Sequence, residues 1–429
     1  MHMTSTALLT DRYELTMLQA ALADGTAHRR SVFELFSRRL TGGRRYGVVA
    51  GTGRVLDALE RFRFGDAELA WLAEAQVVDA PTLDWLADYR FSGSVWGYAE
   101  GEIFLPHSPV LVVESTFAEG VLLETLVLSI LNHDSAIASA GARMIAAAAG
   151  RPCIEMGSRR THEEAAVAAA RAAHLVGFAA TSNLEAGRRH GVPTTGTSAH
   201  AFTLLHDTER DAFSAQVASL GTGTTLLVDT YDVAEAIRTA IDVAGPGLGA
   251  VRIDSGDLVS LAHEVRRQLD DLGAPDVRII VTSDLDEHAI AALAAAPVDG
   301  YGVGTSLVTG SGVPTCGFVY KLVARADDSG QMEPVAKAST AKTSVGGRKY
   351  AVRRLTDGVA TAELVGVGQP PAHDGDDRPL LVELVRDGER VHHASLVDAA
   401  DHHRAAMAEL PAAAAQLSPG GPVLETLLT

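Results

Sequence analysis

Several short apolar runs of the chain end in residues that can do chemistry. His200 closes the segment Gly196-Thr197-Ser198-Ala199-His200, whose small residues leave the imidazole accessible, and an imidazole is a nucleophile or a base near neutral pH. A lone histidine is usually structural or on the surface, and the chain has 16 histidines. Asp229 follows the next apolar run and is suited to orient an imidazole ring, so His200 and Asp229 are predicted to act together.

One cation and two carboxylates stand close together in Arg252-Ile253-Asp254-Ser255-Gly256-Asp257. Because side chains repeat every two residues along a strand, Arg252 and Asp254 are expected on the same face. The set suits a metal-bound or hydroxylated ligand, although in isolation it is more often an Asp-Ser-Gly turn with a solvated ion pair. Gly157-Ser158-Arg159-Arg160 adds adjacent guanidinium groups, which can bind a carboxylate or a phosphate or simply begin a helix.

Glycines and hydroxyl groups end the last apolar run, in Gly300-Tyr301-Gly302-Val303-Gly304-Thr305-Ser306. Backbone N–H groups in such a segment, together with a following helix N-terminus, can hold a phosphate. A single Gly-x-Gly is a weak signal. Its place after the last strand of a barrel, where phosphate sites usually lie, is the stronger argument.

The apolar runs are predicted to be parallel strands, because from about residue 108 onwards they alternate with Ala- and Leu-rich helical stretches. The predicted strands are 109–113, 151–156, 177–181, 192–196, 224–228, 249–253, 277–281 and 298–302. Polar residues at the C-terminal ends of such strands converge on one rim, as in a (β/α)8-type barrel. The barrel must be irregular, since residues 184–191 are too few for a crossover helix.

The predicted protein is therefore α/β, with two domains. Residues 108–344 form an irregular TIM-like barrel that carries the active site. Residues 1–107 form an N-terminal α/β domain, to which residues 345–429 return. The length of 429 residues agrees with two or three domains.

The composition excludes several classes of protein. A formal net charge of −18, with no long basic run, argues against a nucleic-acid partner. Two cysteines far apart in sequence give neither a disulfide framework nor a zinc site. No signal peptide or membrane-spanning apolar stretch is recognisable, so a cytoplasmic protein without a membrane partner is expected.

Ordered motifs over nearly the whole chain carry a family resemblance. They are residues 10–15, 33–38, 157–160, 181–183, 196–200, 252–257, 282–284 and 302–306. Together they resemble the nicotinate phosphoribosyltransferase family. The resemblance implies a type II phosphoribosyltransferase fold, with an irregular barrel, an α/β domain built from both termini, and a homodimer that shares its active sites.

The resemblance also implies the reaction. Nicotinate and 5-phosphoribosyl 1-pyrophosphate would give nicotinate mononucleotide and pyrophosphate, a step of NAD biosynthesis or salvage. ATP would drive the reaction by phosphorylating His200, with Asp229 orienting the ring, and Mg²⁺ would assist. The added phosphate would place negative charge near the pyrophosphate site and so couple product release to ATP hydrolysis.

Individual residues take roles from the resemblance. Arg159 and Arg252 would hold the substrate carboxylate and nearby phosphates, and Asp254 and Asp257 would face the ribose hydroxyls or Mg²⁺. Tyr13 would come from the partner subunit and stack on the pyridine ring. The other implied substrate-binding residues are Asp11, Arg38, Gly157, Thr181, Ser182, Ser283, Asp284, Gly302, Gly304, Thr305, Lys337, Ser339 and Lys342.

Two positions depart from the patterns of relatives. Met156 stands where an aromatic side chain often covers the second face of the pyridine. Ser182 aligns with an Asp of the nicotinamide enzymes, and a carboxylate there would repel nicotinate, so Ser182 favours the acid over the amide.

Other functions remain open on the sequence. The same chemistry on nicotinamide or quinolinate is one alternative, although quinolinate enzymes are shorter and want more cations. A phosphate-binding lyase or aldolase is another, but none of the predicted strand ends carries a Schiff-base lysine. A non-catalytic, nucleotide-binding paralogue is the third, against which the intact His200, Arg252, Asp254 and Asp284 speak.

Overall fold

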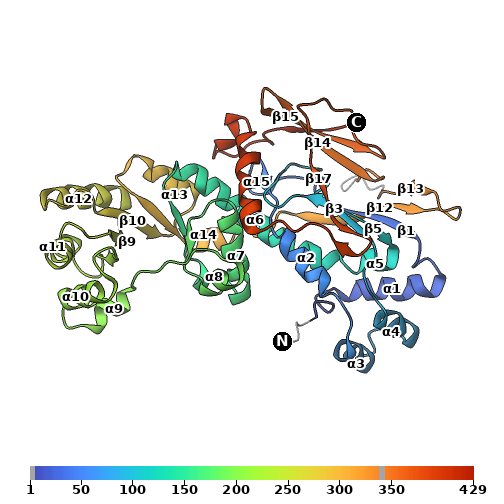
Figure 1. Ribbon diagram of the computed structural model, residues 1–429, viewed down its shortest axis with the longest axis horizontal. Coiled ribbons are helices and arrows are strands. Elements are labelled where there is room, and N and C mark those ends of the chain that lie inside the picture. The colour runs from blue at the N-terminus through green and yellow to red at the C-terminus, as the bar shows by residue number, and fades with distance from the viewer. Residues whose placement is uncertain (1–4, 338–343) are drawn as a thin grey trace. The chain divides into compact units, whose positions relative to one another are not determined.

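The structure, a computed structural model, describes residues 5–337 and 344–429 (Figure 1). The chain divides into two compact units: unit 1 comprises residues 1–139 and 313–429, and unit 2 comprises residues 140–312. Unit 1 contains both ends of the chain. The boundaries differ from the predicted ones, because residues 108–139 and 313–344 belong to unit 1. The predicted site residues Ser339 and Lys342 lie outside the described residues.

Unit 1 is built on an antiparallel sheet of seven strands in the order β13-β12-β1-β5-β3-β17-β18. Their bounds are β1 (Arg30–Ser37), β3 (Ser94–Tyr98), β5 (Leu111–Thr116), β12 (Phe318–Ala326), β13 (Met332–Pro334), β17 (Leu381–Arg386) and β18 (Glu389–Arg390). The first predicted barrel strand, 109–113, overlaps β5 only at residues 111–113, and β5 lies antiparallel between β1 and β3. That assignment to the barrel is wrong, since a buried apolar run reads alike in either kind of sheet.

Smaller sheets and helices complete unit 1. A four-stranded sheet has the order β16-β14-β15-β19, and β2 pairs with β4. These strands are β2 (Gly47–Val48), β4 (Ile103–Phe104), β14 (Lys349–Thr356), β15 (Val359–Val367), β16 (Arg378–Pro379) and β19 (Glu425–Leu428). The helices are α1 (Arg12–Asp24), α2 (Thr52–Glu60), α3 (Asp66–Glu74), α4 (Ala80–Ala87), α5 (Phe117–Val121), α15 (Leu396–Ala408) and the 3-10 turn η3 (Ala412–Ala415). The long helix α6 (Glu124–Ala148) contains the boundary between the units.

Unit 2 contains a parallel sheet of six strands in the order β7-β6-β11-β10-β9-β8. They are β6 (Cys153–Glu155), β7 (Ala180–Thr181), β8 (Thr225–Leu227), β9 (Ala250–Ile253), β10 (Arg278–Ser283) and β11 (Gly300–Val303). The predicted strand 192–196 contributes only a parallel bridge from Thr194 to Thr181. Through the described residues of unit 2 the sheet is thus an open half-barrel, and the α/β class is confirmed.

Helices connect these parallel strands. They are η1 (Ser158–Arg160), α7 (Glu163–Leu175), α8 (Leu184–His190), α9 (His200–Leu205), α10 (Glu209–Leu220), α11 (Val233–Ala244), α12 (Leu258–Asp271), α13 (Glu287–Ala292), η2 (Leu293–Ala295) and α14 (Thr305–Val308). Figure 1 shows α12 beside β10, and the two are in contact. Several of these helices begin at an Asp or Asn whose side chain accepts a backbone N–H, as Asn183, Asp232, Asp257 and Asp286 do. Polar residues after strands therefore serve both the rim and the helix starts.

The apolar side chains of the parallel strands in unit 2 are buried. Val251, Ile253, Ile279 and Val281 are fully buried, as expected for parallel strands covered on both faces. Arg252 is the one half-exposed residue of β9.

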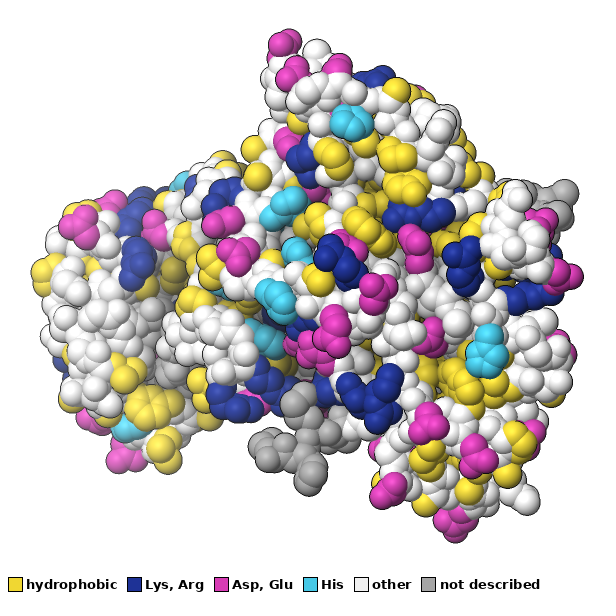
Figure 2. Space-filling view, turned by 45° about the vertical axis from the view of Figure 1, so that its right-hand side comes forward, with side chains coloured by type: hydrophobic (Ala, Val, Ile, Leu, Met, Phe, Trp, Pro, Cys, Tyr) yellow, Lys and Arg dark blue, Asp and Glu magenta, His cyan; other side chains and the backbone are white. Residues whose placement is uncertain are grey.

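No helix in the described part of the chain is long and apolar enough to cross a bilayer. Basic and acidic side chains both occur across the face shown in Figure 2.

Candidate active site

A pocket of about 230 Å³ opens at the C-terminal ends of β6, β9, β10 and β11. Its lining residues all belong to unit 2 and are Met156, Arg159, Arg160, Arg252, Asp254, Thr282, Ser283, Asp284, Gly302, Gly304 and Thr305. Polar residues after four separate strands therefore meet at one rim. This is the position at which parallel α/β folds bind ligands.

Glycines let the backbone come close around this pocket. A Cβ on Gly302 would lie 2.5 Å from Thr282 Cγ2 and 2.8 Å from Met156 Sδ. A Cβ on Gly157 would lie 2.2 Å from Val308 Cγ1. All three distances are shorter than a Cβ atom tolerates, so neither position admits a side chain without rearrangement.

Arg252 supplies the pocket with a partly free cation. One of its Nη atoms donates to the Thr197 hydroxyl, whereas its buried Nε has no hydrogen-bond partner among the described residues. Burial lowers the pKa of Arg252, and the carboxylates of Asp254 and Asp229 oppose that shift. A guanidinium group stays charged even so, because its ordinary pKa is above 12. Arg252 is thus prepared to bind an anionic ligand.

Asp254 is fixed from two sides. Its Oδ1 accepts the Thr282 hydroxyl at 2.5 Å, and its backbone N–H donates to Asp229 Oδ2 at 2.8 Å. The Ser255 hydroxyl donates to the same Asp229 oxygen at 2.7 Å. These bonds hold the Asp254 loop rigidly at the edge of the pocket.

His200 stands next to this loop. Its Nε2 lies 3.9 Å from Asp229 Oδ1, and its Nδ1 lies 3.1 Å from the Thr230 hydroxyl. The His200 side chain is 41% exposed, whereas Asp229 is 3% exposed. Asp229 Oδ1 is buried without a hydrogen bond in the described structure. The ring is therefore held by Thr230 and faces Asp229 at ion-pair distance, while one side remains open to a ligand.

Comparisons with known proteins agree with this geometry. Residues 8–132 match the model of the nicotinate phosphoribosyltransferase N-terminal domain, and residues 152–351 match the nicotinate phosphoribosyltransferase family model. The chain is 58% identical over 429 residues to nicotinate phosphoribosyltransferase pncB1 of Mycobacterium tuberculosis, covering 98% of this chain and 94% of that protein. The chain belongs to the nicotinate phosphoribosyltransferase family.

Other family members are more distant. Nicotinate phosphoribosyltransferase of Bacillus subtilis is 37% identical over 359 residues, which cover 81% of this chain and 73% of that protein. The crystal structure of human nicotinic acid phosphoribosyltransferase superimposes with a TM-score of 0.84 at 25% identity, covering 98% of this chain and 97% of that one. The predicted family is therefore confirmed over nearly the full length.

The structure separates the residues that the family resemblance implies into groups. Arg159, Arg252, Asp254, Ser283, Asp284, Gly302, Gly304 and Thr305 line the pocket. Asp257 and Ser182 are exposed and do not line it, while Thr181 is buried beside it. Asp257 instead caps α12, where its side chain accepts from the Ser260 N–H at 3.3 Å and the Ser260 hydroxyl at 2.9 Å.

Among the residues that the structure describes, four implied site residues belong to unit 1: Asp11, Tyr13, Arg38 and Lys337. Tyr13 is 45% exposed, and partial burial together with Glu124 and Glu14 raises its pKa to about 12, so its hydroxyl stays neutral. The Arg38 guanidinium lies 5.6 Å from the centroid of the Phe36 ring. Asp11 precedes α1 at its N-cap position.

Sequence reasoning missed several residues around the site. Thr197 and Thr230 hold Arg252 and His200, and Glu155 holds the turn that carries Arg159. Threonine and glutamate are too common for their types to signal such roles. Thr282 and Arg160 line the pocket and lay inside recognised motifs, although neither was named as a site residue.

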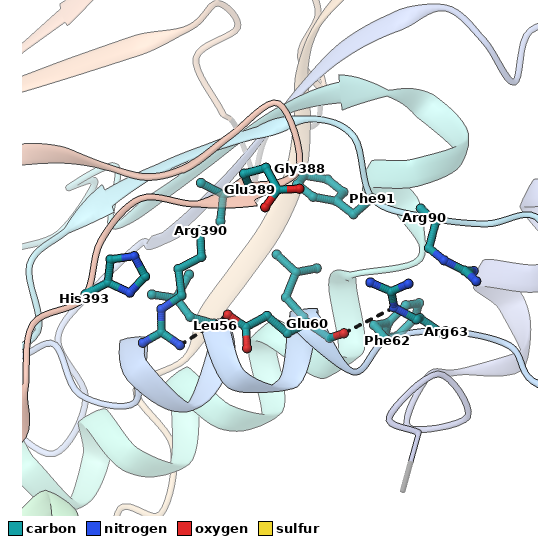
Figure 3. A pocket seen from close by; sticks show the side chains of 12 residues that line it. Leu56, Glu60, Phe62, Arg63, Arg90, Phe91, Gly388, Glu389, Arg390 and His393 are labelled. Atoms are coloured by element: carbon teal, nitrogen blue, oxygen red, sulfur yellow. Dashed lines mark hydrogen bonds and ion pairs between the residues drawn. The ribbon is translucent and has the colours of Figure 1, made fainter. Parts of the chain in front are cut away.

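A larger pocket, of about 350 Å³, lies wholly within unit 1 (Figure 3). Its apolar lining includes Leu56, Phe62 and Phe91, and Figure 3 shows Arg390 reaching toward Glu60. Arg390 pairs with Asp57 at 2.8 Å and Glu60 at 3.5 Å. The pocket contains none of the predicted site residues, so unit 2 holds the candidate active site.

Proposed function

We propose that this protein transfers the phosphoribosyl group of 5-phosphoribosyl 1-pyrophosphate to nicotinate and couples the transfer to ATP hydrolysis through His200. The supporting observation is the pocket in which Arg159, Arg252, Asp254 and Asp284 meet next to the His200–Asp229 pair. The family relatives carry the nicotinate phosphoribosyltransferase name. Cations for an anionic base and carboxylates for a metal-bound pyrophosphate are what this reaction requires.

In the transfer step, the pyridine nitrogen of nicotinate attacks C1 of the ribose. The bond from C1 to the pyrophosphate oxygen breaks, and pyrophosphate leaves with the electron pair. Arg252 and Arg159 bind the anionic groups and hold the base in line, which lowers the barrier by orientation and by stabilising developing charge. Gly302, Gly304 and Thr305 line the pocket at the end of β11, where the proposal places the 5-phosphate.

Mg²⁺ suits the same pocket. Asp254 and Asp284 supply carboxylate oxygens, and Mg²⁺ is commonly held by one or two carboxylates together with substrate phosphates. Among the described residues no group of three or more His, Cys, Asp or Glu forms a metal site. Asp254 and Asp284 would hold the ion together with the substrate's own phosphates, and the ion would supply positive charge to the leaving pyrophosphate.

The coupling step uses His200. A proton on Nδ1 donated to the Thr230 hydroxyl leaves the Nε2 lone pair free to attack the γ-phosphorus of ATP. ADP leaves, and water later hydrolyses the phosphohistidine to release phosphate. Asp229 would stabilise the ring while it carries the positive charge of the transition state.

The proposal includes a cytoplasmic homodimer with shared active sites. Tyr13 is 45% exposed, and the proposal places its ring against the ligand of the neighbouring subunit.

The deciding experiment mixes the purified protein with 5-phosphoribosyl 1-pyrophosphate and Mg²⁺, and with nicotinate, nicotinamide or quinolinate in parallel, each with and without ATP. Mass spectrometry follows the mononucleotide. We expect product from nicotinate alone, increased by ATP. Product from nicotinamide would overturn the argument from Ser182, and absence of any product would leave a non-catalytic family member.

A further inference from the structure

Glu155 is a fully buried carboxylate at the end of β6. Its Oε1 accepts the N–H of Gly157, and its Oε2 accepts the hydroxyl of Thr181. The described residues place no cation in an ion pair with it. Burial raises the pKa of Glu155, while the Thr181 and Gly157 bonds lower it. Burying a carboxyl group without a cation partner costs free energy of folding, so a role for this group in the structure is expected.

The two hydrogen bonds of Glu155 join two separate turns at the pocket. Gly157 begins the turn that carries Arg159 and Arg160, both of which line the pocket. Thr181 begins the turn at the end of β7 that carries Ser182. A carboxylate that accepts from both turns fixes the distance between them.

A second set of bonds reinforces the same link. The Asn183 N–H donates to the Thr181 hydroxyl at 2.9 Å, and the Asn183 side-chain amide donates to the Ser158 hydroxyl at 2.9 Å. The Met156 N–H donates to the Val303 carbonyl at 2.8 Å. The turn after β6 is thereby tied to both neighbouring strands, β7 and β11.

Space around Gly157 leaves the turn little freedom. A Cβ on Gly157 would lie 3.0 Å from Glu155 Oε1 and 3.1 Å from the Gly304 carbonyl oxygen. A shift of the Glu155 carboxylate therefore changes the position of the Gly157 peptide and of the arginines that follow it.

We propose that Glu155 is a positioning residue, which holds the Arg159 turn and the Ser182 turn at one separation and thereby sets the affinity for the anionic base. The inference rests on the proposed function. Glu155 does not touch the substrate or move a proton in the reaction, because it is fully buried and both its oxygens are engaged. It acts through the geometry of its two hydrogen bonds.

Three variants separate geometry from charge. Glu155→Gln keeps both bonds, since its amide oxygen accepts from Gly157 and its NH₂ group donates to the Thr181 oxygen. Thr181→Val removes the bond to Glu155, and with it the bond that the Thr181 hydroxyl accepts from the Asn183 N–H, at nearly constant volume. Glu155→Ala removes both. Glu363→Ala is the control for a general loss of stability. Glu363 is also a fully buried carboxylate, but it belongs to unit 1 and accepts the Tyr98 hydroxyl.

Steady-state kinetics with nicotinate and 5-phosphoribosyl 1-pyrophosphate test the inference. In Glu155→Ala we expect the KM for nicotinate to rise on the order of 10²-fold, the size of effect that a misplacement of about 1 Å produces, with a smaller change in kcat. Thr181→Val should show a smaller rise, and Glu155→Gln should stay within about threefold of the wild type. Glu363→Ala should lower stability and leave the KM unchanged.

Backbone amide exchange, measured by mass spectrometry without ligand, gives a second readout that does not need activity. Glu155→Ala and Thr181→Val should exchange faster over residues 157–160 and 181–183, and Glu155→Gln should not. If the wild type makes no mononucleotide, the proposed function fails. The exchange measurement still tests whether Glu155 holds the two turns together. Unchanged exchange in both Thr181→Val and Glu155→Ala would overturn the inference. So would a KM for nicotinate in Glu155→Gln as high as in Glu155→Ala while both turns stay protected from exchange.

Discussion

Asp229 joins His200 to the loop of the pocket. Its Oδ1 lies 3.9 Å from His200 Nε2, and its Oδ2 accepts the backbone N–H of Asp254 at 2.8 Å. One carboxylate thus contacts both the histidine proposed to carry a phosphate and the backbone of a residue that lines the transfer pocket. Asp229 therefore links the proposed phosphorylation site to the backbone of Asp254 through a single side chain.

Replacing His200 should uncouple ATP from transfer. In His200→Ala we expect ATP hydrolysis and ATP stimulation to disappear, while slow ATP-independent transfer persists because the pocket residues remain. The measurement is mononucleotide and phosphate release with and without ATP. His206→Gln is the matched control, since His206 lies at the other end of the same short helix and bonds the Phe202 carbonyl. ATP stimulation that persists in His200→Ala would remove His200 from the mechanism.

Arg252 should contribute strongly to transfer. In Arg252→Ala we expect kcat/KM to fall on the order of 10²–10³-fold, as when a preorganised donor to developing charge is removed. Arg252→Lys should be intermediate, because it keeps the charge and loses the planar fork. Arg278→Ala is the control, since Arg278 is exposed at the start of β10 and bonds the Gly249 carbonyl. A near-normal rate in Arg252→Ala would show that this guanidinium does not bind the reacting anions.

A buried ion network in unit 1 should make stability depend on acid. Glu102 is 1% exposed and contacts Arg378 at 2.6 Å and His402 at 2.9 Å. Burial by itself would raise the pKa of Glu102, but His402, Arg378 and Arg353 outweigh it and hold that pKa below the ordinary 4.5. The unfolded chain therefore binds a proton first, so this stabilisation is present above about pH 4.5 and is lost as the pH falls toward the folded-state pKa.

Glu102→Gln tests that network by denaturant unfolding between pH 3 and pH 7. We expect the free energy of unfolding at pH 7 to fall by about 3–5 kcal/mol, because the change leaves buried cations without their carboxylate, and the loss of stability on acidification to become shallower. Glu185→Gln is the contrast, since Glu185 pairs with Arg188 and Arg189 on the surface, where such pairs contribute little. Equal stability of Glu102→Gln and wild type at pH 7 would mean that the network gives no net stabilisation.

The sequence predicted the parts of the site that follow from local periodicity. Arg252 and Asp254 line one pocket because strand alternation places them on one face. Gly302, Gly304 and Asp284 also meet there, since parallel strands bring their C-terminal ends to one edge. These relationships need only the strand assignment and the order of elements.

The sequence did not predict features that depend on pairing in space. Residues 111–113 of the predicted strand 109–113 belong to an antiparallel strand of unit 1, which their apolar character cannot distinguish from a parallel one. The partners of His200 and Arg252 include Thr230 and Thr197, and only the folded chain brings those hydroxyls within reach. Glu155 was equally hidden, because nothing in its neighbours along the chain indicates that it lies between two turns.

Asp257 carries two competing interpretations that one pair of variants can separate. The family resemblance implies a role toward the ribose or Mg²⁺, whereas the structure shows an exposed carboxylate that caps α12. Ser is as good an N-cap as Asp and has no charge, while Ala caps poorly. Asp257→Ala should therefore lower the Tm by about 2–4 °C, and Asp257→Ser should leave it nearly unchanged.

The Mg²⁺ dependence of transfer then decides the function of Asp257. We expect Asp257→Ser to need the same Mg²⁺ concentration for half-maximal rate as the wild type, because Asp257 does not line the pocket and its oxygens accept from Ser260. Asp254→Asn is the positive control and should need more Mg²⁺, since it removes a pocket carboxylate while an amide oxygen can still accept from Thr282. A raised Mg²⁺ requirement in Asp257→Ser at unchanged Tm would show instead that the carboxylate leaves its cap to bind the ion when substrate is present.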